Sequence, residues 1–99
     1  MEIKLSCGEL VIIGKEVIKA HIKNQRKEWR YTYEDSVEVT IMGIKFTAEF
    51  YFSNLFDDEP EELGISDVKT DHEDVWVKFE QSDEEIAMFL AKLQMRKSA

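Results

Sequence analysis

The sequence is poor in residues that stabilise or anchor several classes of protein. It contains one cysteine, Cys7, and one proline, Pro60, and its longest uninterrupted apolar run covers only positions 10–13. A single cysteine cannot form an internal disulfide, so we expect the fold to depend on a packed core. The apolar run is far shorter than the about 20 residues that cross a bilayer, and shorter than the apolar part of a signal peptide. We therefore expect a soluble, cytoplasmic protein with no membrane attachment.

Recognisable catalytic motifs are absent as well. The sequence has no glycine-rich phosphate loop, no nucleophile elbow and no histidine–serine arrangement. His72 lies in the acidic segment 71–74, where neighbouring side chains of an extended chain point to opposite faces, and the spacing fits neither a calcium loop nor a zinc site. His21 lies between Lys19 and Lys23, so we expect it on the surface. The sequence predicts no enzyme activity, no cofactor and no metal site.

The first half of the chain alternates apolar and polar residues, a pattern typical of strands with one buried face. The alternation covers residues 3–7, 18–22 and 29–33, and glycines at positions 8 and 14 suggest turns between them. Folding the chain about the polar loop 24–27 would pair the apolar residues of its flanks and leave the cations outside. Cys7 is in phase with Ile3 and Leu5, which predicts a buried core position.

A second hairpin is indicated at Met42-Gly43. Apolar residues occupy odd positions from Val37 to Ile41 and even positions from Ile44 to Phe52. A two-residue loop would explain this change of phase by pairing Ile41 with Ile44, whereas a bulge in one long strand is the alternative.

The second half ends in a predicted helix. Residues 53–70 are interpreted as a long anchored loop, and residues 75–79 alternate like a strand. Ser82 and Glu85 have the spacing of a capping box, and apolar residues then recur at helical intervals at Ile86, Phe89, Leu90 and Leu93. The predicted fold is a single α+β domain over residues 1–99, mainly antiparallel β. It has about seven strands in a meander or partial barrel, packed by one C-terminal amphipathic helix.

Two segments resemble the pleckstrin-homology-like barrel, including its bacterial variants. Residues 33–37 are similar to a tyrosine-acid-acid turn in bacterial members, and residues 75–85 with Phe89 and Leu93 are similar to the last strand and capping helix. The resemblance implies a binding fold that carries no particular chemistry. Residues 6–9 lack the basic cluster that family members use on inositol phosphates, so lipid binding is not implied.

Charge is strongly segregated along the chain. The net charge is −8, and residues 57–85 contain thirteen acids against two lysines. We expect this surface to dock onto a basic patch of a partner protein, as small acidic inhibitors, immunity proteins and anti-defence proteins do. The acids at the start of the helix also complement its dipole. The predicted partner-binding residues are seven acids and two aromatics on the polar phase of their strands: Asp57, Asp58, Glu59, Glu61, Glu62, Asp71, Asp74, Tyr51 and Trp76.

The alternative is a binding module for an anionic ligand, a nucleic acid or lipid headgroup, that uses the basic stretch 15–30. In the predicted strands Trp29, Tyr31 and Tyr33 face the core, away from the cations, which makes a nucleic-acid surface the weaker interpretation. Exposed strand edges are compatible with a monomer or a weak homodimer.

Overall fold

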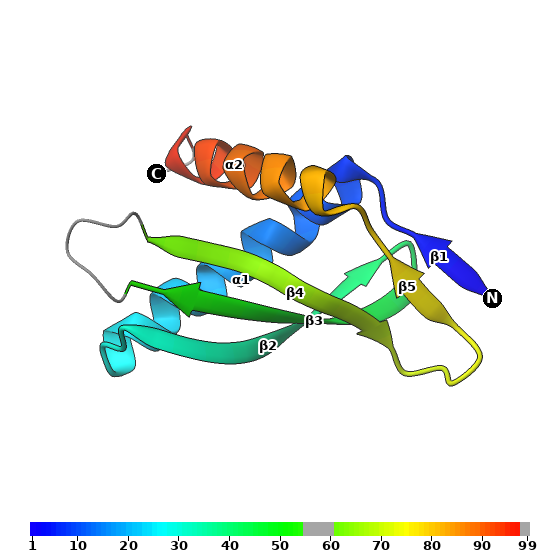
Figure 1. The fold of residues 1–99 in the computed structure, drawn as a ribbon, viewed down its shortest axis with the longest axis horizontal. Coiled ribbons are helices and arrows are strands. Elements are labelled where there is room, and N and C mark those ends of the chain that lie inside the picture. Colours follow the sequence, from blue (N-terminus) through cyan, green and yellow to red (C-terminus); the bar gives the residue numbers. More distant parts are fainter. Residues whose placement is uncertain (55–60, 98–99) are drawn as a thin grey trace.

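The computed structural model describes residues 1–54 and 61–97, which form two helices and five strands. Three antiparallel strands form a sheet in the order β2-β3-β4, and β1 pairs with β5 in parallel (Figure 1). Helix α1 crosses one face of the sheet, and α2 packs against α1 beside β4. The elements are β1 (Glu2–Lys4), α1 (Cys7–Lys27), β2 (Thr32–Ile41), β3 (Ile44–Ser53), β4 (Glu62–Thr70), β5 (Trp76–Lys78) and α2 (Gln81–Lys97).

The fold is α+β as predicted, but the seven-stranded meander or partial barrel with one helix is wrong. The largest error concerns residues 7–27, which form α1 instead of strands. Ser6 caps this helix, since its hydroxyl accepts from the Glu9 N–H at 3.3 Å and the Glu9 carboxylate accepts from the Ser6 N–H at 3.0 Å. Leu10, Ile13 and Val17 follow at helical spacing and are fully buried. The capping box and the three-to-four residue period outweigh the short stretches of alternation.

The glycines expected to make turns lie inside α1. At Gly14 an added Cβ would lie 3.0 Å from the Met88 sulfur and 3.2 Å from the Ala91 Cβ. The absence of a side chain at this position therefore allows α2 to approach α1 closely. Cys7, predicted to be buried, is half-buried at the start of the helix and packs against the core.

The hairpin at Met42-Gly43 is confirmed. Ile41 pairs with Ile44, and both loop residues have positive φ, 51° at Met42 and 79° at Gly43. This is the backbone of a primed turn, whose twist matches that of the flanking strands. The alternative of one long bulged strand is wrong, although a bulge does occur between β3 and β4, beside Phe50.

Two further expectations are corrected on this sheet. Residues 62–70, interpreted as loop, form β4, and its apolar residues Ile65 and Val68 are buried against the sheet's helical side. Residues 33–37, interpreted as a turn, lie within β2, where Tyr33 is opposite Phe52. Strand β3 supplies the centre of the core, because its alternation buries Phe46, Ala48, Phe50 and Phe52.

Helix α2 is where it was predicted but is rotated about its axis. It begins at Gln81, and the Glu84 N–H donates to the Glu80 carbonyl at 3.0 Å, so Ser82 lies in the first turn and not at the cap. The buried face consists of Ala87, Met88 and Ala91. Of the apolar residues expected in the core, Leu90 packs against it, whereas the other three face outward: Ile86 is 52%, Phe89 63% and Leu93 38% exposed.

No helix within residues 1–54 and 61–97 is long and apolar enough to cross a membrane.

Replacing Gly14 with leucine should lower the free energy of unfolding by about 1–3 kcal/mol, because the new side chain must displace α2. Gly8→Leu is the matched control, since a Cβ there meets only the Ser6 hydroxyl, at 3.9 Å. Urea unfolding of both variants measures the difference. Equal stability of the two variants would contradict the close packing of α1 on α2.

Candidate functional site

The described members of the predicted partner-binding set fall into two groups at opposite ends of β4. Tyr51, Glu61 and Glu62 lie near its first residue, whereas Asp71, Asp74 and Trp76 follow its last residue. Nine residues of strand separate the groups by roughly 27 Å. Asp57, Asp58 and Glu59 lie outside the described residues. The structure therefore does not join these acids into one surface.

The group after β4 lies beside the N-terminus of the chain. The Met1 ammonium donates to the Asp74 carbonyl at 2.6 Å, and the Trp76 N–H donates to the Met1 carbonyl at 3.0 Å. Asp71 is exposed and lies 3.8 Å from His72. Trp76 is 54% exposed, so the expectation that it points outward is met.

The group at the start of β4 borders a pocket of about 230 Å³ between that strand and the first turns of α2. Glu62, the first residue of β4, and Glu61 just before it line one side of the pocket, and Glu84 and Glu85 of α2 line the other. We call these four glutamates and Tyr51 the acidic pocket. Sequence reasoning assigned Glu84 and Glu85 to the helix dipole and missed their proximity to the strand.

Tyr51 lies across the backbone of β4. It is opposite Gly64, where an added Cβ would lie 2.6 Å from the tyrosine hydroxyl oxygen and 2.7 Å from the ring carbon that carries it. Only glycine leaves room for this aromatic ring. The hydroxyl donates to the Glu62 carboxylate at 2.9 Å, which fixes one side of the pocket.

Tyr51 is influenced both by burial and by the negative charges of the pocket. Its pKa is raised to about 12, first by burial, then by the hydrogen bond to Glu62 and the negative charges of Glu62, Glu84 and Glu85. Each of these effects disfavours the negatively charged phenolate. The part of the shift that comes from Glu62, Glu84 and Glu85 shows that these carboxylates lie close enough to act on Tyr51.

Glu84 connects α2 to the sheet. Only 7% of its surface is exposed, and its carboxylate accepts from the Ile65 N–H at 2.9 Å, beside the bulge in β4. Burial raises the pKa of Glu84, the hydrogen bond from Ile65 lowers it, and the charges of Glu85 and Glu62 raise it further. This carboxylate satisfies an edge-strand N–H and at the same time adds negative charge to the pocket.

The carboxylates of the acidic pocket form no ion pair with a described cationic side chain, although the charge of Lys92 offsets part of the rise that burial causes in the pKa of Glu84. No Lys, Arg or His nitrogen of the described residues lies within 4.0 Å of Glu61, Glu62, Glu84 or Glu85. Lys92 borders the pocket at a greater distance. Within residues 1–54 and 61–97, no three His, Cys, Asp or Glu side chains are arranged to hold a metal ion. Four carboxylates so close together can accept hydrogen bonds from a guanidinium or an ammonium group.

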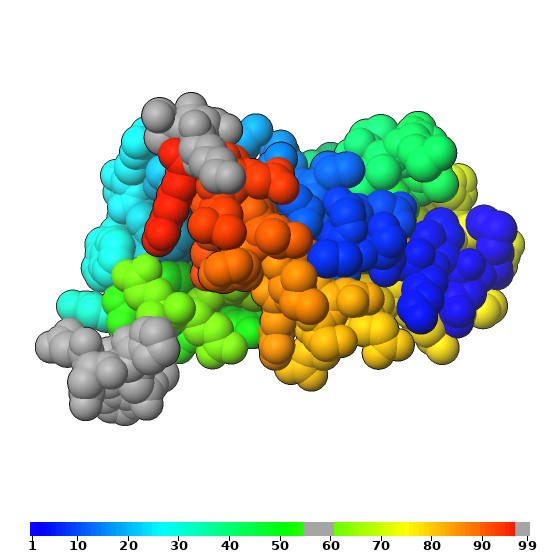
Figure 2. Space-filling view, turned by 90° about the horizontal axis from the view of Figure 1, so that it is seen from above, coloured from blue at the N-terminus to red at the C-terminus, as the bar shows by residue number. Residues whose placement is uncertain are grey.

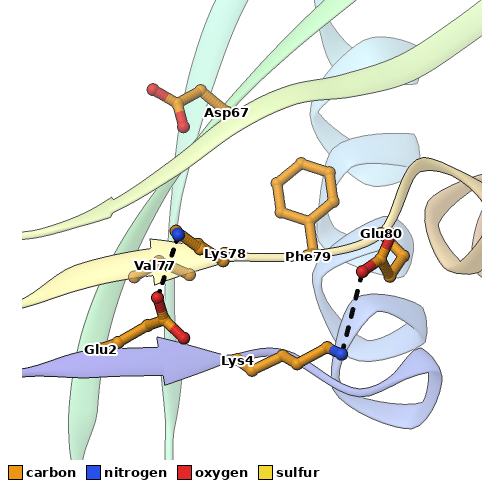
Figure 3. A pocket seen from close by; sticks show the side chains of 7 residues that line it. All are labelled: Glu2, Lys4, Asp67, Val77, Lys78, Phe79 and Glu80. Atoms are coloured by element: carbon orange, nitrogen blue, oxygen red, sulfur yellow. Dashed lines mark ion pairs between the residues drawn. The ribbon is translucent and has the colours of Figure 1, made fainter.

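A second pocket, of about 460 Å³, differs in its charges (Figure 3). Lys78 pairs with Glu2 at 3.1 Å, and Lys4 is 3.8 Å from Glu80. Phe79 and Asp67 also line this pocket. Since its acids and lysines pair with one another, this pocket presents little uncompensated charge to a ligand.

The basic stretch forms the second half of α1 and the loop after it, not a hairpin. Trp29 is 54% and Tyr31 62% exposed, so the expectation that they face the core is wrong, and only Tyr33 is buried. The Gln25 side chain holds the loop by donating to the Arg30 carbonyl and accepting from its N–H, both at 2.9 Å. The loop therefore displays two aromatic rings beside Arg30 in a fixed position.

His21, expected on the surface, is half-buried behind this loop. Its Nδ1 lies 2.8 Å from the Tyr33 hydroxyl, and its ring centroid lies 4.2 Å from that of Phe52. Burial lowers the pKa of His21. The imidazole packs against the sheet because residue 21 belongs to a helix that covers it.

Comparisons with protein-family models, with curated proteins and with solved structures find no match for this chain. The resemblance to pleckstrin-homology-like domains stays a hypothesis, and the described strands do not form the barrel that it implies.

Replacing Glu84 with alanine should lower the free energy of unfolding by about 1–3 kcal/mol, because the buried Ile65 N–H loses its acceptor. Glu84→Gln keeps a side-chain oxygen there and removes a buried charge, so its stability at neutral pH should equal or exceed that of the wild type.

Burial raises the pKa of Glu84, so ionisation costs stability as pH rises above the ordinary value of 4.5. The advantage of Glu84→Gln in urea unfolding should therefore grow with pH, and an equal loss in both variants would contradict this role.

Proposed function

We propose that this chain is a non-enzymatic interaction protein whose acidic pocket receives a lysine or arginine side chain from the basic surface of a partner protein. The supporting observation is that four glutamates line one pocket together with Tyr51, with no described cationic nitrogen within 4.0 Å of their carboxylates. A partner's cation would offset the mutual repulsion of these charges.

The pocket is suited to a guanidinium group in particular. Its glutamates approach from two elements, so they can accept hydrogen bonds from several N–H groups of one planar cation. Tyr51 already holds one oxygen of Glu62, which reduces the freedom that this carboxylate loses on binding. Preorganised acceptors of this kind favour arginine over lysine, whose ammonium is a more strongly hydrated point charge.

The charge distribution also supports rapid association. The chain has a net charge of −8, and residues 57–85 carry thirteen of its acids against two lysines. Such a field attracts a basic protein over distances comparable to the Debye length, about 8–10 Å at ordinary ionic strength. Small size and acidic charge are consistent with a cytoplasmic inhibitor, immunity protein or anti-defence protein that covers a basic surface of its target.

Reversing Glu61 and Glu62 to lysine together should weaken capture of the partner about tenfold or more, because each change removes an acceptor and adds repulsion. Asp71→Lys with Asp74→Lys is the matched control, since it makes the same change in net charge at the other end of β4. The measurement is retention of proteins from the native host on each immobilised variant, at low salt and at about 0.5 M salt. Retention that survives both the pocket reversal and high salt would refute the proposal.

A second candidate function is binding of an anionic ligand at the loop that carries Trp29, Arg30 and Tyr31. The specific observation in its favour is that both aromatic rings are exposed and that Gln25 fixes the loop between them. Exposed rings beside cations can stack on the bases of a single-stranded nucleic acid. The net charge of −8 opposes this function, and we rank it second.

A heparin column at moderate salt distinguishes the two functions. We expect the wild type to pass through, because repulsion from the acidic residues exceeds attraction by one basic loop. Retention that is lost in both Arg30→Glu and Trp29→Ala would instead support the anionic ligand.

A further inference from the structure

Helix α2 has two apolar faces, and only one of them has a partner in the described chain. The inner face is made of Ala87, Met88 and Ala91, which are at most 4% exposed. The outer face, which we call the α2 stripe, consists of Ile86, Phe89 and Leu93, at 52%, 63% and 38% exposure. Figure 2 shows α2 lying uncovered along this side of the molecule. Three large apolar side chains exposed in one row form the kind of patch that marks a contact with another surface.

The spacing of the α2 stripe is that of a helix–helix contact. Ile86, Phe89 and Leu93 are three and then four residues apart, as in one heptad of a coiled coil. Such a stripe fits the groove of another helix better than it fits a flat surface.

The charges beside the α2 stripe identify the helix that fits it. Glu85 and Lys92 are exposed and seven residues apart, so they lie on the same side of the stripe, about 10.5 Å from one another along the axis. This distance is too long for an ion pair within one helix. A second α2 in the antiparallel direction would place Glu85 of each copy opposite Lys92 of the other. A parallel two-fold copy would instead place this flank of each helix at opposite edges of the contact, where Glu85 and Lys92 could not pair with their counterparts.

We infer that the α2 stripe binds a second copy of this chain, with the two α2 helices antiparallel about a two-fold axis near Phe89. The same residues contribute from both sides, as a closed two-fold interface requires. The stripe buries Phe89 at the centre, and two Glu85–Lys92 pairs flank it. Phe89 and Lys92 also line the acidic pocket, so the second copy lies along the helical edge of that pocket. In this dimer Lys92 neutralises the partner copy's Glu85, and Glu61, Glu62 and Glu84 remain in the pocket. The dimer does not rest on the proposed function, because no basic partner is needed to form it.

The interface is one helix pair, which is smaller than the about 1,600 Å² that a standard stable interface buries. The dimer should therefore dissociate on dilution, and its mass should fall toward that of the 11.6 kDa monomer. Sedimentation equilibrium over about 1 µM to 1 mM covers the range expected for such an interface.

The decisive test uses substitutions of exposed residues. Phe89→Glu should raise the dissociation constant of the dimer tenfold or more. Tyr31→Glu is the matched control, because Tyr31 is as exposed (62%) as Phe89 (63%) but lies outside the α2 stripe, and it should leave the dissociation constant unchanged. Glu85→Lys and Lys92→Glu should each weaken the dimer by placing like charges opposite one another. The double variant Glu85→Lys/Lys92→Glu should restore it. Circular dichroism of each variant checks that α2 is retained.

Three results would overturn the inference. A wild type that stays monomeric at about 1 mM has no such interface. Equal effects of Phe89→Glu and Tyr31→Glu would place the interface elsewhere. Single charge variants that dimerise as well as the wild type, or a double variant that fails to recover, would exclude the antiparallel pairing.

Discussion

The close approach of α2 to α1 at Gly14 determines most of what the surface presents. Since no side chain stands at this position, Ala87, Met88 and Ala91 form the inner face of α2. With that face fixed, Ile86, Phe89 and Leu93 of the same helix turn outward, and Glu84 reaches the Ile65 N–H on β4. One packing contact therefore orients both the α2 stripe and the helical half of the acidic pocket.

In the acidic pocket, the cost of burying and crowding carboxylates competes with the hydrogen bond that holds Glu84 to β4. Burying Glu84 costs free energy, as its raised pKa shows, and the glutamates around it repel one another. The hydrogen bond from Ile65 offsets part of this cost and holds α2 against the sheet. A basic side chain from a partner would offset more of it. This is the physical reason for proposing a binding site here and not at the larger pocket near Lys78, where acids and lysines already pair.

Local patterns predicted part of this structure well. The change of phase at Met42-Gly43 identified the hairpin, because each strand has one buried face and the loop needs residues that tolerate positive φ. The same reasoning failed over residues 7–27, where short alternating stretches masked a helical period. The signal that would have found α1 is Ser6 followed by Glu9, the same capping pattern that was assigned to Ser82.

The candidate site could not be assembled from the sequence, because its two halves depend on tertiary contacts. The glutamates of β4 and α2 are more than twenty positions apart, and nothing local shows that Tyr51 crosses Gly64. The central claim of the account is that the acidic pocket binds a basic side chain. The most direct test is a titration with N-acetyl-arginine amide in which the backbone amide chemical shifts of the protein are monitored by NMR. The account predicts shifts concentrated at Gly64, Ile65 and the first turn of α2, and their loss in a Glu61→Lys/Glu62→Lys variant. Shifts confined to the region of Trp76, or none at all, would contradict it.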